Sequence, residues 1–181
     1  RCLEKTAEVI RREYAVKEAE MCIHGEKLGE GSTRVLQPVS ASRVVLALVH
    51  MPNGVQKMEE ALEGAVRTSL NLGQISLGEE CFTAVSSVRS SLASEKDWLL
   101  EKLQSLAMLL GGECEITGEY PAWEYRPDSR IRELIVRIYE EQTGKKAEIC
   151  SIHAGLECGI LADKLPGLDC GSCGAPTCKA L

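Results

Sequence analysis

The sequence has no long apolar run, no low-complexity tract and no excess of basic residues. No apolar stretch approaches the ~20 residues that a helix needs to cross a bilayer, so we expect no membrane partner. The net charge is −6 and the 21 basic residues are scattered, which excludes the clustered basic surface of a nucleic-acid-binding protein. With 44% hydrophobic and 27% charged residues, the composition is that of a soluble globular protein.

The start of the chain also lacks a secretory signal and an initiating Met, because Arg1 leads directly into a helical pattern. We therefore expect a fragment of a longer protein. An odd number of cysteines, nine, without a signal favours reduced thiols and a cytoplasmic location over a disulfide scaffold. The first six, from Cys2 to Cys158, are interpreted as small hydrophobic residues in the interior.

The residues before position 121 predict an α+β region with antiparallel strands. Residues 65–77 and 81–89 are two strand-like runs separated by Gly78-Glu79-Glu80, which predicts a hairpin. Further strands are predicted at 19–26 and 113–118. Helices are predicted over residues 3–14, from a cap at Ser40 or Ser42 to Met51, and from a cap at Ser94 to Gly111-Gly112.

Residues 121–127 form a predicted boundary, since they hold two prolines and show little periodicity. Beyond them, Asp128 or Ser129 can cap a helix that Gly144 ends. A strand at 147–152, a glycine loop and a short helix at 156–165 follow, which is the order of an α/β layer. We therefore divide the chain into an α+β domain, 1–120, and an α/β portion, 121–181.

His153 and Glu157 are candidate binding residues because of where they stand. A loop that leaves the carboxyl end of a sheet strand and enters a helix is where α/β proteins bind ligands, and Gly155 lets backbone approach a ligand closely. The alternative is a structural histidine beside a helix glutamate. One His/Glu pair leaves a metal site incomplete, so we do not expect these two to bind a metal alone.

Arg89 is a second candidate, at the end of a strand that otherwise carries hydroxyl groups, SSVRSS at 86–91. A guanidinium group matches a carboxylate in bidentate geometry. The alternative is a solvated arginine at a sheet edge.

Cys170, Cys173 and Cys178 form the most specific cysteine pattern, C-x₂-C-x₄-C. Three thiolates this close can hold zinc or an iron–sulfur cluster, but a stable site needs a fourth ligand.

Several segments together resemble the cytosolic Xaa-His dipeptidases, the aminoacyl-histidine dipeptidase family of zinc metallopeptidases. IHAGLECG at 152–159 is the most diagnostic, and the resemblance covers about residues 1–169. The other segments, in order, are MPNGV at 51–55, TSLNLG at 68–73, SSVRSS at 86–91, GEYPAW at 118–123, RPDS at 126–129 and PGLD at 166–169.

The resemblance implies a fold and a set of roles. In that family an α/β catalytic domain with two zinc ions is interrupted by an α+β lid. Residues 1–120 resemble the later part of the lid and 121–181 the returning part of the catalytic domain. Arg89 matches the arginine that binds the carboxylate of a short peptide substrate, and His153, Gly155 and Glu157 match the substrate loop.

The resemblance also implies that this chain lacks the catalytic metal centre and the catalytic base of the family. The family's zinc ligands and catalytic glutamate lie in an N-terminal portion that is absent here, so no residue is assigned as catalytic. After residue 169 the tail resembles a cysteine-rich four-iron module instead. Three hypotheses follow: a dipeptidase fragment inactive alone, an iron–sulfur electron carrier or accessory module, and a lid-type domain used for homodimerisation.

Overall fold

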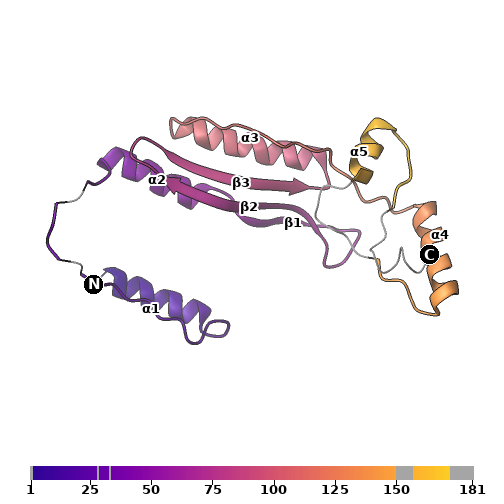
Figure 1. Cartoon of the computed structure of the whole chain (residues 1–181), viewed down its shortest axis with the longest axis horizontal. Helices are drawn as coiled ribbons and strands as arrows, with labels where there is room; N and C mark the ends of the chain where they lie inside the picture. The colour runs from indigo at the N-terminus through magenta and orange to yellow at the C-terminus, as the bar shows by residue number, and fades with distance from the viewer. Residues whose placement is uncertain (1, 28, 33, 150–156, 172–181) are drawn as a thin grey trace. The chain divides into compact units, whose positions relative to one another are not determined.

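A computed structural model describes residues 2–27, 29–32, 34–149 and 157–171 (Figure 1). The chain divides into two compact units, Arg1–Gln37 and Pro38–Leu181. None of the helices in the described ranges has both the length and the apolar character needed to cross a bilayer. The separate division near Pro121, between a lid-type region and a catalytic portion, stays a prediction.

Among its described residues, the first unit has one helix, α1 (Cys2–Tyr14), as the amphipathic pattern predicts. Ala7 is its buried residue, at 3% exposure. The strand predicted at 19–26 is wrong: residues 19–20 form a turn and 21–26 an irregular segment. Arg11 Nη2 donates a hydrogen bond to the carbonyl of Ile23 over 3.2 Å, so a helix side chain takes the place of a partner strand there.

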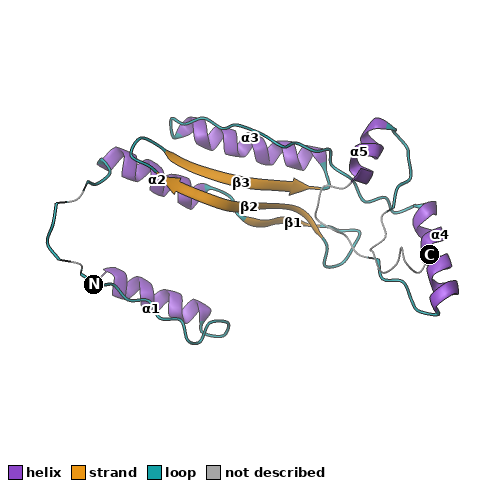
Figure 2. Cartoon of the chain, viewed as in Figure 1, coloured by secondary structure: helices purple, strands orange, loops and turns teal. Residues whose placement is uncertain are grey.

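The second unit is built on an antiparallel sheet with strand order β1-β2-β3 (Figure 2). The strands are β1 (Gly54–Met58), β2 (Val66–Leu77) and β3 (Phe82–Ser90). The predicted hairpin is confirmed as β2 and β3, closed by a hydrogen bond of 2.9 Å from Gly78 N to Cys81 O. The exposure of β3 alternates residue by residue, which is typical of a strand with one face covered.

Helices α2 (Pro38–His50) and α3 (Ala93–Leu109) accompany the sheet, and α3 packs against β3 (Figure 1). The best-buried side chains of this unit, Leu70 and Leu99, are each 1% exposed. Gly111, with φ of 76°, follows the end of α3 as predicted. Ser94 does not cap α3, because the helix starts one residue earlier and Leu92 takes the N-cap position without a side-chain bond.

Two further helices follow, α4 (Arg130–Thr143) and α5 (Glu157–Lys164). Ser129 caps α4 by accepting from Arg132 N, and Gly144 ends it with φ of 65°, both as predicted. The strand predicted at 113–118 is wrong, since these residues form no backbone ladder with another strand. Residues 147–149 are not a strand either, and 150–152 lie outside the described residues. The α+β class with antiparallel strands is nevertheless confirmed, and within the described ranges no strand follows Ser90.

The interpretation of the first six cysteines as interior residues is wrong for those that the structure describes. Cys158 is half-buried, and Cys150 lies outside the described ranges. The remaining four are exposed, namely Cys2, Cys22, Cys81 and Cys114.

Candidate substrate-binding site

Arg89 lies near the end of β3 on a polar face of the sheet. It pairs with Ser69 on β2, and Ser87 pairs with Asn71 two positions along. Residues that pair directly across an antiparallel ladder share a face, so these four side chains are neighbours. Arg89, Ser87 and Asn71 are exposed and Ser69 is half-buried. A guanidinium surrounded by hydroxyl and amide groups is a suitable surface for a carboxylate.

The opposite face of the same ladder carries the buried pairs. Leu70 pairs with Val88 and Thr68 with Ser90. Thr68 is 2% exposed, and its hydroxyl lies 2.8 Å from the Ser90 hydroxyl. Arg89 therefore lies in the chain between Val88 and Ser90, whose side chains are on the covered face.

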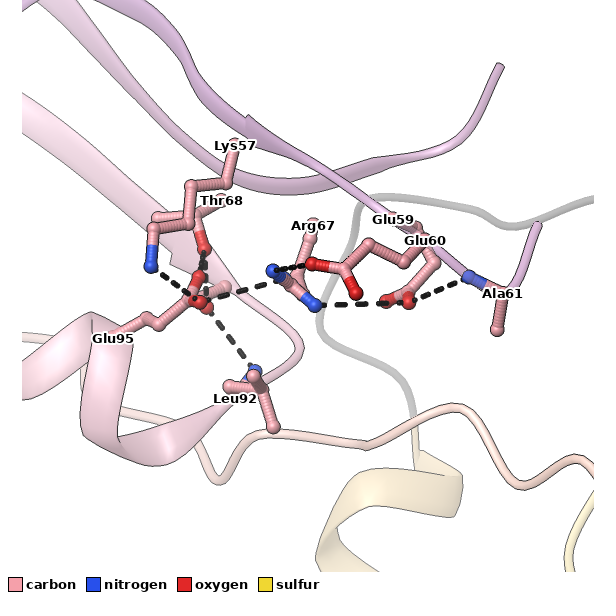
Figure 3. Close-up of polar contacts among 9 residues, drawn as sticks. Lys57, Glu59, Glu60, Ala61, Arg67, Thr68, Leu92 and Glu95 are labelled. Carbon is pink, nitrogen blue, oxygen red and sulfur yellow. Dashed lines mark hydrogen bonds and ion pairs between the residues drawn. The ribbon is translucent and has the colours of Figure 1, made fainter. Parts of the chain in front are cut away.

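Glu95, in the first turn of α3, is the centre of the polar cluster at this end of the sheet (Figure 3). Its carboxylate accepts hydrogen bonds from the Thr68 hydroxyl and, over 2.9 Å, from Lys57 Nζ. Arg67 Nε lies 3.4 Å from Glu95 Oε1. One helix carboxylate thus joins side chains from β1 and β2 and, through Thr68, reaches Ser90 at the end of β3.

The carboxyl of Glu95 stays ionised despite its partial burial. Desolvation raises its pKa, but the hydrogen bonds from Thr68 and Lys57 and the charge of Arg67 outweigh it and hold the pKa below its ordinary value. The Glu95 and Arg67 side chains are 13% and 16% exposed. An ion pair this sheltered is screened less than a surface pair, so we interpret it as structural support for the strand ends.

Arg67 extends the cluster toward the loop between β1 and β2. Its Nη2 lies 3.3 Å from Glu60 Oε1 and its Nη1 lies 3.9 Å from Glu59 Oε1 (Figure 3). The carbonyl of Arg67 also accepts a hydrogen bond of 3.0 Å from Ser91 N. The exit from β3, two residues after Arg89, is therefore fixed to β2 by backbone as well as by side chains.

Helix α5 packs against the segment that follows α3. Gly159 is buried, and a Cβ there would lie 3.2 Å from Pro121 O and 3.4 Å from Trp123 Cβ. Lys96 of α3 donates to the Tyr120 carbonyl and to Glu119 Oε1, each over 3.2 Å. These contacts bring α3, residues 119–123 and α5 together.

An open cavity of about 490 Å³ lies where these elements meet. It is lined by Lys96 and Asp97 from α3, by Trp123, and by Asp163 from α5. Both signs of charge face it, which suits a small zwitterionic molecule as well as water. The first turns of α3 line this cavity. The end of β3, which carries Arg89, directly precedes α3 in the sequence.

Of the predicted substrate-loop residues, the structure describes Glu157 and not the others. Glu157 is the exposed first residue of α5. His153 and Gly155 lie outside the described residues. The roles predicted for Arg89, His153, Gly155 and Glu157 stay predictions.

The metal ligands predicted in the tail are also mostly outside the described residues. Cys170 is described and half-buried, whereas Cys173 and Cys178 are not described. Across the described ranges, no group of three or more His, Cys, Asp or Glu side chains is arranged to hold a metal ion. The described residues alone therefore do not supply the two-zinc centre that the resemblance implies.

Sequence reasoning missed Glu95 and Asp169, two carboxylates that each accept hydrogen bonds from two groups. The Asp169 side chain accepts a hydrogen bond of 2.7 Å from the Ser129 hydroxyl and one of 3.0 Å from Ile131 N. A glutamate in the first turn of a predicted helix was the available signal for Glu95. The sequence around Asp169 contains no such signal, because its partners, Ser129 and Ile131, lie at the start of α4.

Comparison with known proteins confirms the resemblance seen in the sequence. No family model matches the chain. It is 30% identical over 167 residues to the cytosol non-specific dipeptidase of Escherichia coli (strain K12), covering 92% of this chain and 34% of that protein. The crystal structure of aminoacylhistidine dipeptidase from Vibrio alginolyticus matches with a TM-score of 0.82 and 34% identity, covering 92% of this chain and 34% of the other. The chain thus spans about a third of the length of these relatives.

Proposed function

Because the chain is homologous to about a third of two dipeptidases, we propose that it is the substrate-binding part of a metal-dependent dipeptidase. Its substrates would be Xaa-His or similar short peptides. The observation that carries the proposal is the position of Arg89, opposite Ser69 on the exposed polar face of the sheet. The iron–sulfur alternative gains no support from the relatives, both of which are dipeptidases.

Arg89 is the proposed clamp for the C-terminal carboxylate of the peptide. Its guanidinium can donate two parallel hydrogen bonds to one carboxylate, and the Ser69 and Ser87 hydroxyls beside it can donate further bonds. The Glu95 cluster on the other face would keep the end of β3 in place while the carboxylate binds. Pre-organisation of this kind raises affinity because less is lost on ordering the site.

The substrate loop is the proposed second contact. Glu157 carries a negative charge at the exposed start of α5, which suits the free amine of a dipeptide. His153 and Gly155 precede it in the sequence and are proposed to contact the peptide in the same loop.

The metal centre is proposed to come from other parts of the whole protein. Zinc would activate water for attack on the peptide carbonyl, but the described residues offer no metal site. We therefore expect the purified chain with added zinc to leave a Xaa-His dipeptide intact. Metal-dependent cleavage above a buffer blank would contradict this.

The test of substrate binding is a chimaera in which this chain replaces the matching third of the E. coli dipeptidase. We expect Arg89→Lys to raise KM for a dipeptide by at least tenfold, because a point charge replaces a bidentate donor. A C-terminally amidated dipeptide, which has no C-terminal carboxylate, should lose this sensitivity. Arg137→Lys is the matched control, since Arg137 makes an exposed pair with Glu141. Equal KM values for the Arg89 and Arg137 variants would exclude the clamp.

We also propose a cytoplasmic location, which the E. coli relative supports because it is a cytosol dipeptidase. In addition, we propose a homodimer formed through residues 1–120. The dimer is supported by apolar side chains exposed on α2, where Val39, Val45 and Val49 are 65%, 57% and 69% exposed. Sedimentation of the chain should give the mass of two copies, and Val45→Glu should return it to one.

A further inference from the structure

The polar face of the sheet continues beyond Arg89 along β2 and β3. Arg89 pairs with Ser69, and the next pair on the same face is Ser87 with Asn71. Residues two apart on a strand share a face and lie about 7 Å from each other. Ser87 and Asn71 are both exposed. Within the described ranges, neither of these two side chains has a hydrogen-bond partner, so both polar groups are available to a ligand on this face.

A bulge in β2 leaves open space beside Asn71. The register of the β2–β3 ladder shifts between Leu72 and Gln74, so Gly73 is the extra residue. Gly73 does not have a positive φ, so its backbone conformation does not require glycine. A Cβ at this position would lie 3.4 Å from Asn71 Nδ2. The missing side chain therefore keeps the space around the Asn71 amide open.

The groups of Asn71 and Ser87 match the imidazole ring of a histidine. A neutral imidazole has one N–H donor and one ring nitrogen that accepts, whereas an asparagine amide and a serine hydroxyl can each donate and accept. In a C-terminal histidine the carboxylate lies one bond from Cα and the ring two bonds from it. A carboxylate bound at Arg89 therefore leaves the ring of the same residue within reach of the next pair along the face.

We propose that Asn71 and Ser87 form the subsite for the side chain of the peptide's C-terminal residue and that they favour histidine there. Arg89 binds a carboxylate, which every dipeptide has, so Arg89 alone does not distinguish one dipeptide from another. A leucine side chain in the subsite forms no hydrogen bond with either group. The subsite rests on the proposed function of Arg89, because the carboxylate must bind there for the ring to reach Asn71.

The test compares kcat/KM for Gly-His and Gly-Leu in the chimaera with the E. coli dipeptidase. Asn71→Leu keeps the size of the side chain and removes its donor and acceptor. We expect the preference for Gly-His over Gly-Leu to fall by about three- to tenfold, the effect of losing one hydrogen bond. Ser87→Ala should lower the preference in the same direction, whereas kcat/KM for Gly-Leu should stay close to that of the parent.

Two further variants separate recognition of the ring from an effect on the sheet. Thr83→Val is the matched control, because Thr83 is exposed on the same face of β3, farther from Arg89, and it should leave the preference unchanged. Asn71→Asp places a carboxylate beside the ring and favours imidazolium. Its preference for Gly-His should therefore rise as the pH falls through about 6.5, the ordinary pKa of histidine, which a purely structural role of Asn71 would not produce.

Failure of the subsite and failure of the clamp give different results. If Arg89→Lys raises KM for both peptides but Asn71→Leu leaves the preference for Gly-His unchanged, the subsite is overturned and the clamp stands. If Arg89→Lys affects neither peptide, the clamp itself is refuted. For an inactive chimaera, dissociation constants of the same two peptides for the full chain, measured by NMR titration, give the same comparison and the same two outcomes.

Discussion

Asp169 accepts a hydrogen bond of 2.7 Å from the hydroxyl of Ser129, the residue that caps helix α4. The same hydroxyl accepts from Arg132 N over 3.2 Å, and the second oxygen of Asp169 accepts from Ile131 N over 3.0 Å. A carboxylate from beyond α5 therefore completes the N-terminus of α4, where the helix dipole also favours negative charge. The contact joins two segments that lie 40 residues apart.

Replacement of Ser129 should destabilise the second unit. Ser129 is 3% exposed, and Ser129→Ala removes both the cap and the donor to Asp169. We expect a loss of about 1–2 kcal/mol in the free energy of unfolding, the usual cost of losing a serine cap. Urea denaturation followed by circular dichroism measures it. Ser42→Ala is the control, because the Ser42 hydroxyl makes an exposed bond within α2 and its loss should change stability by under ~0.5 kcal/mol.

The contribution of Asp169 should depend on pH. Hydrogen bonds from Ile131 N and Ser129, which outweigh desolvation, hold the pKa of Asp169 below its ordinary value. A depressed carboxyl pKa stabilises the fold above the unfolded-state pKa, and this stabilisation is lost as the pH falls through the folded-state pKa. The wild type should therefore exceed Asp169→Asn in stability at pH 7, and the two should converge in strong acid. A difference that stays constant from pH 7 to pH 2 would contradict this assignment.

Glu95→Gln should be among the most destabilising polar changes in the chain. It leaves Arg67, 16% exposed, beside a neutral group and weakens the bonds from Lys57 and Thr68. We expect a loss of about 2–3 kcal/mol, typical of sheltered hydrogen bonds to a charged group. Glu101→Gln, at an exposed position of the same helix, should cost under ~0.5 kcal/mol. Equal urea midpoints for the two variants would rule out the supporting role of the cluster.

Gly159→Ala should destabilise the packing of α5. The added methyl would lie 3.2 Å from Pro121 O, and overpacking of this kind costs about 1–3 kcal/mol. Alanine regains up to ~1 kcal/mol of helix propensity, so we expect a net loss of about 1 kcal/mol by chemical denaturation. Gly112→Ala is the control, since its nearest contact is the Ala107 carbonyl at 3.6 Å. A Gly159→Ala chain more stable than wild type would show that α5 can shift freely.

Local signals in the sequence predicted the elements that depend on neighbouring residues. The β2–β3 hairpin, the Ser129 cap and the glycine end of α4 involve groups a few positions apart, and all three are confirmed. The helix predicted at 156–165 is confirmed as Glu157–Lys164. Such features follow from turn chemistry and capping, which act within a few residues.

Strands at 19–26 and 113–118 failed as predictions for a physical reason. Alternating or apolar residues permit an extended chain, but a strand also needs a neighbour to pair its backbone groups. In the described ranges these segments have none, and in the first case Arg11 bonds to the backbone instead. Pairing is a property of the tertiary fold, so short apolar runs overpredict strands.

By itself, the sequence determined the resemblance to dipeptidases, the antiparallel α+β class, and Arg89 and Glu157 as candidates for peptide binding. The tertiary structure decided which groups support them. Glu95 meets Thr68 across 27 residues of sequence, and Asp169 meets Ser129 across 40. A carboxylate has no local pattern that reveals its partner, because such contacts form only when packing brings distant segments together.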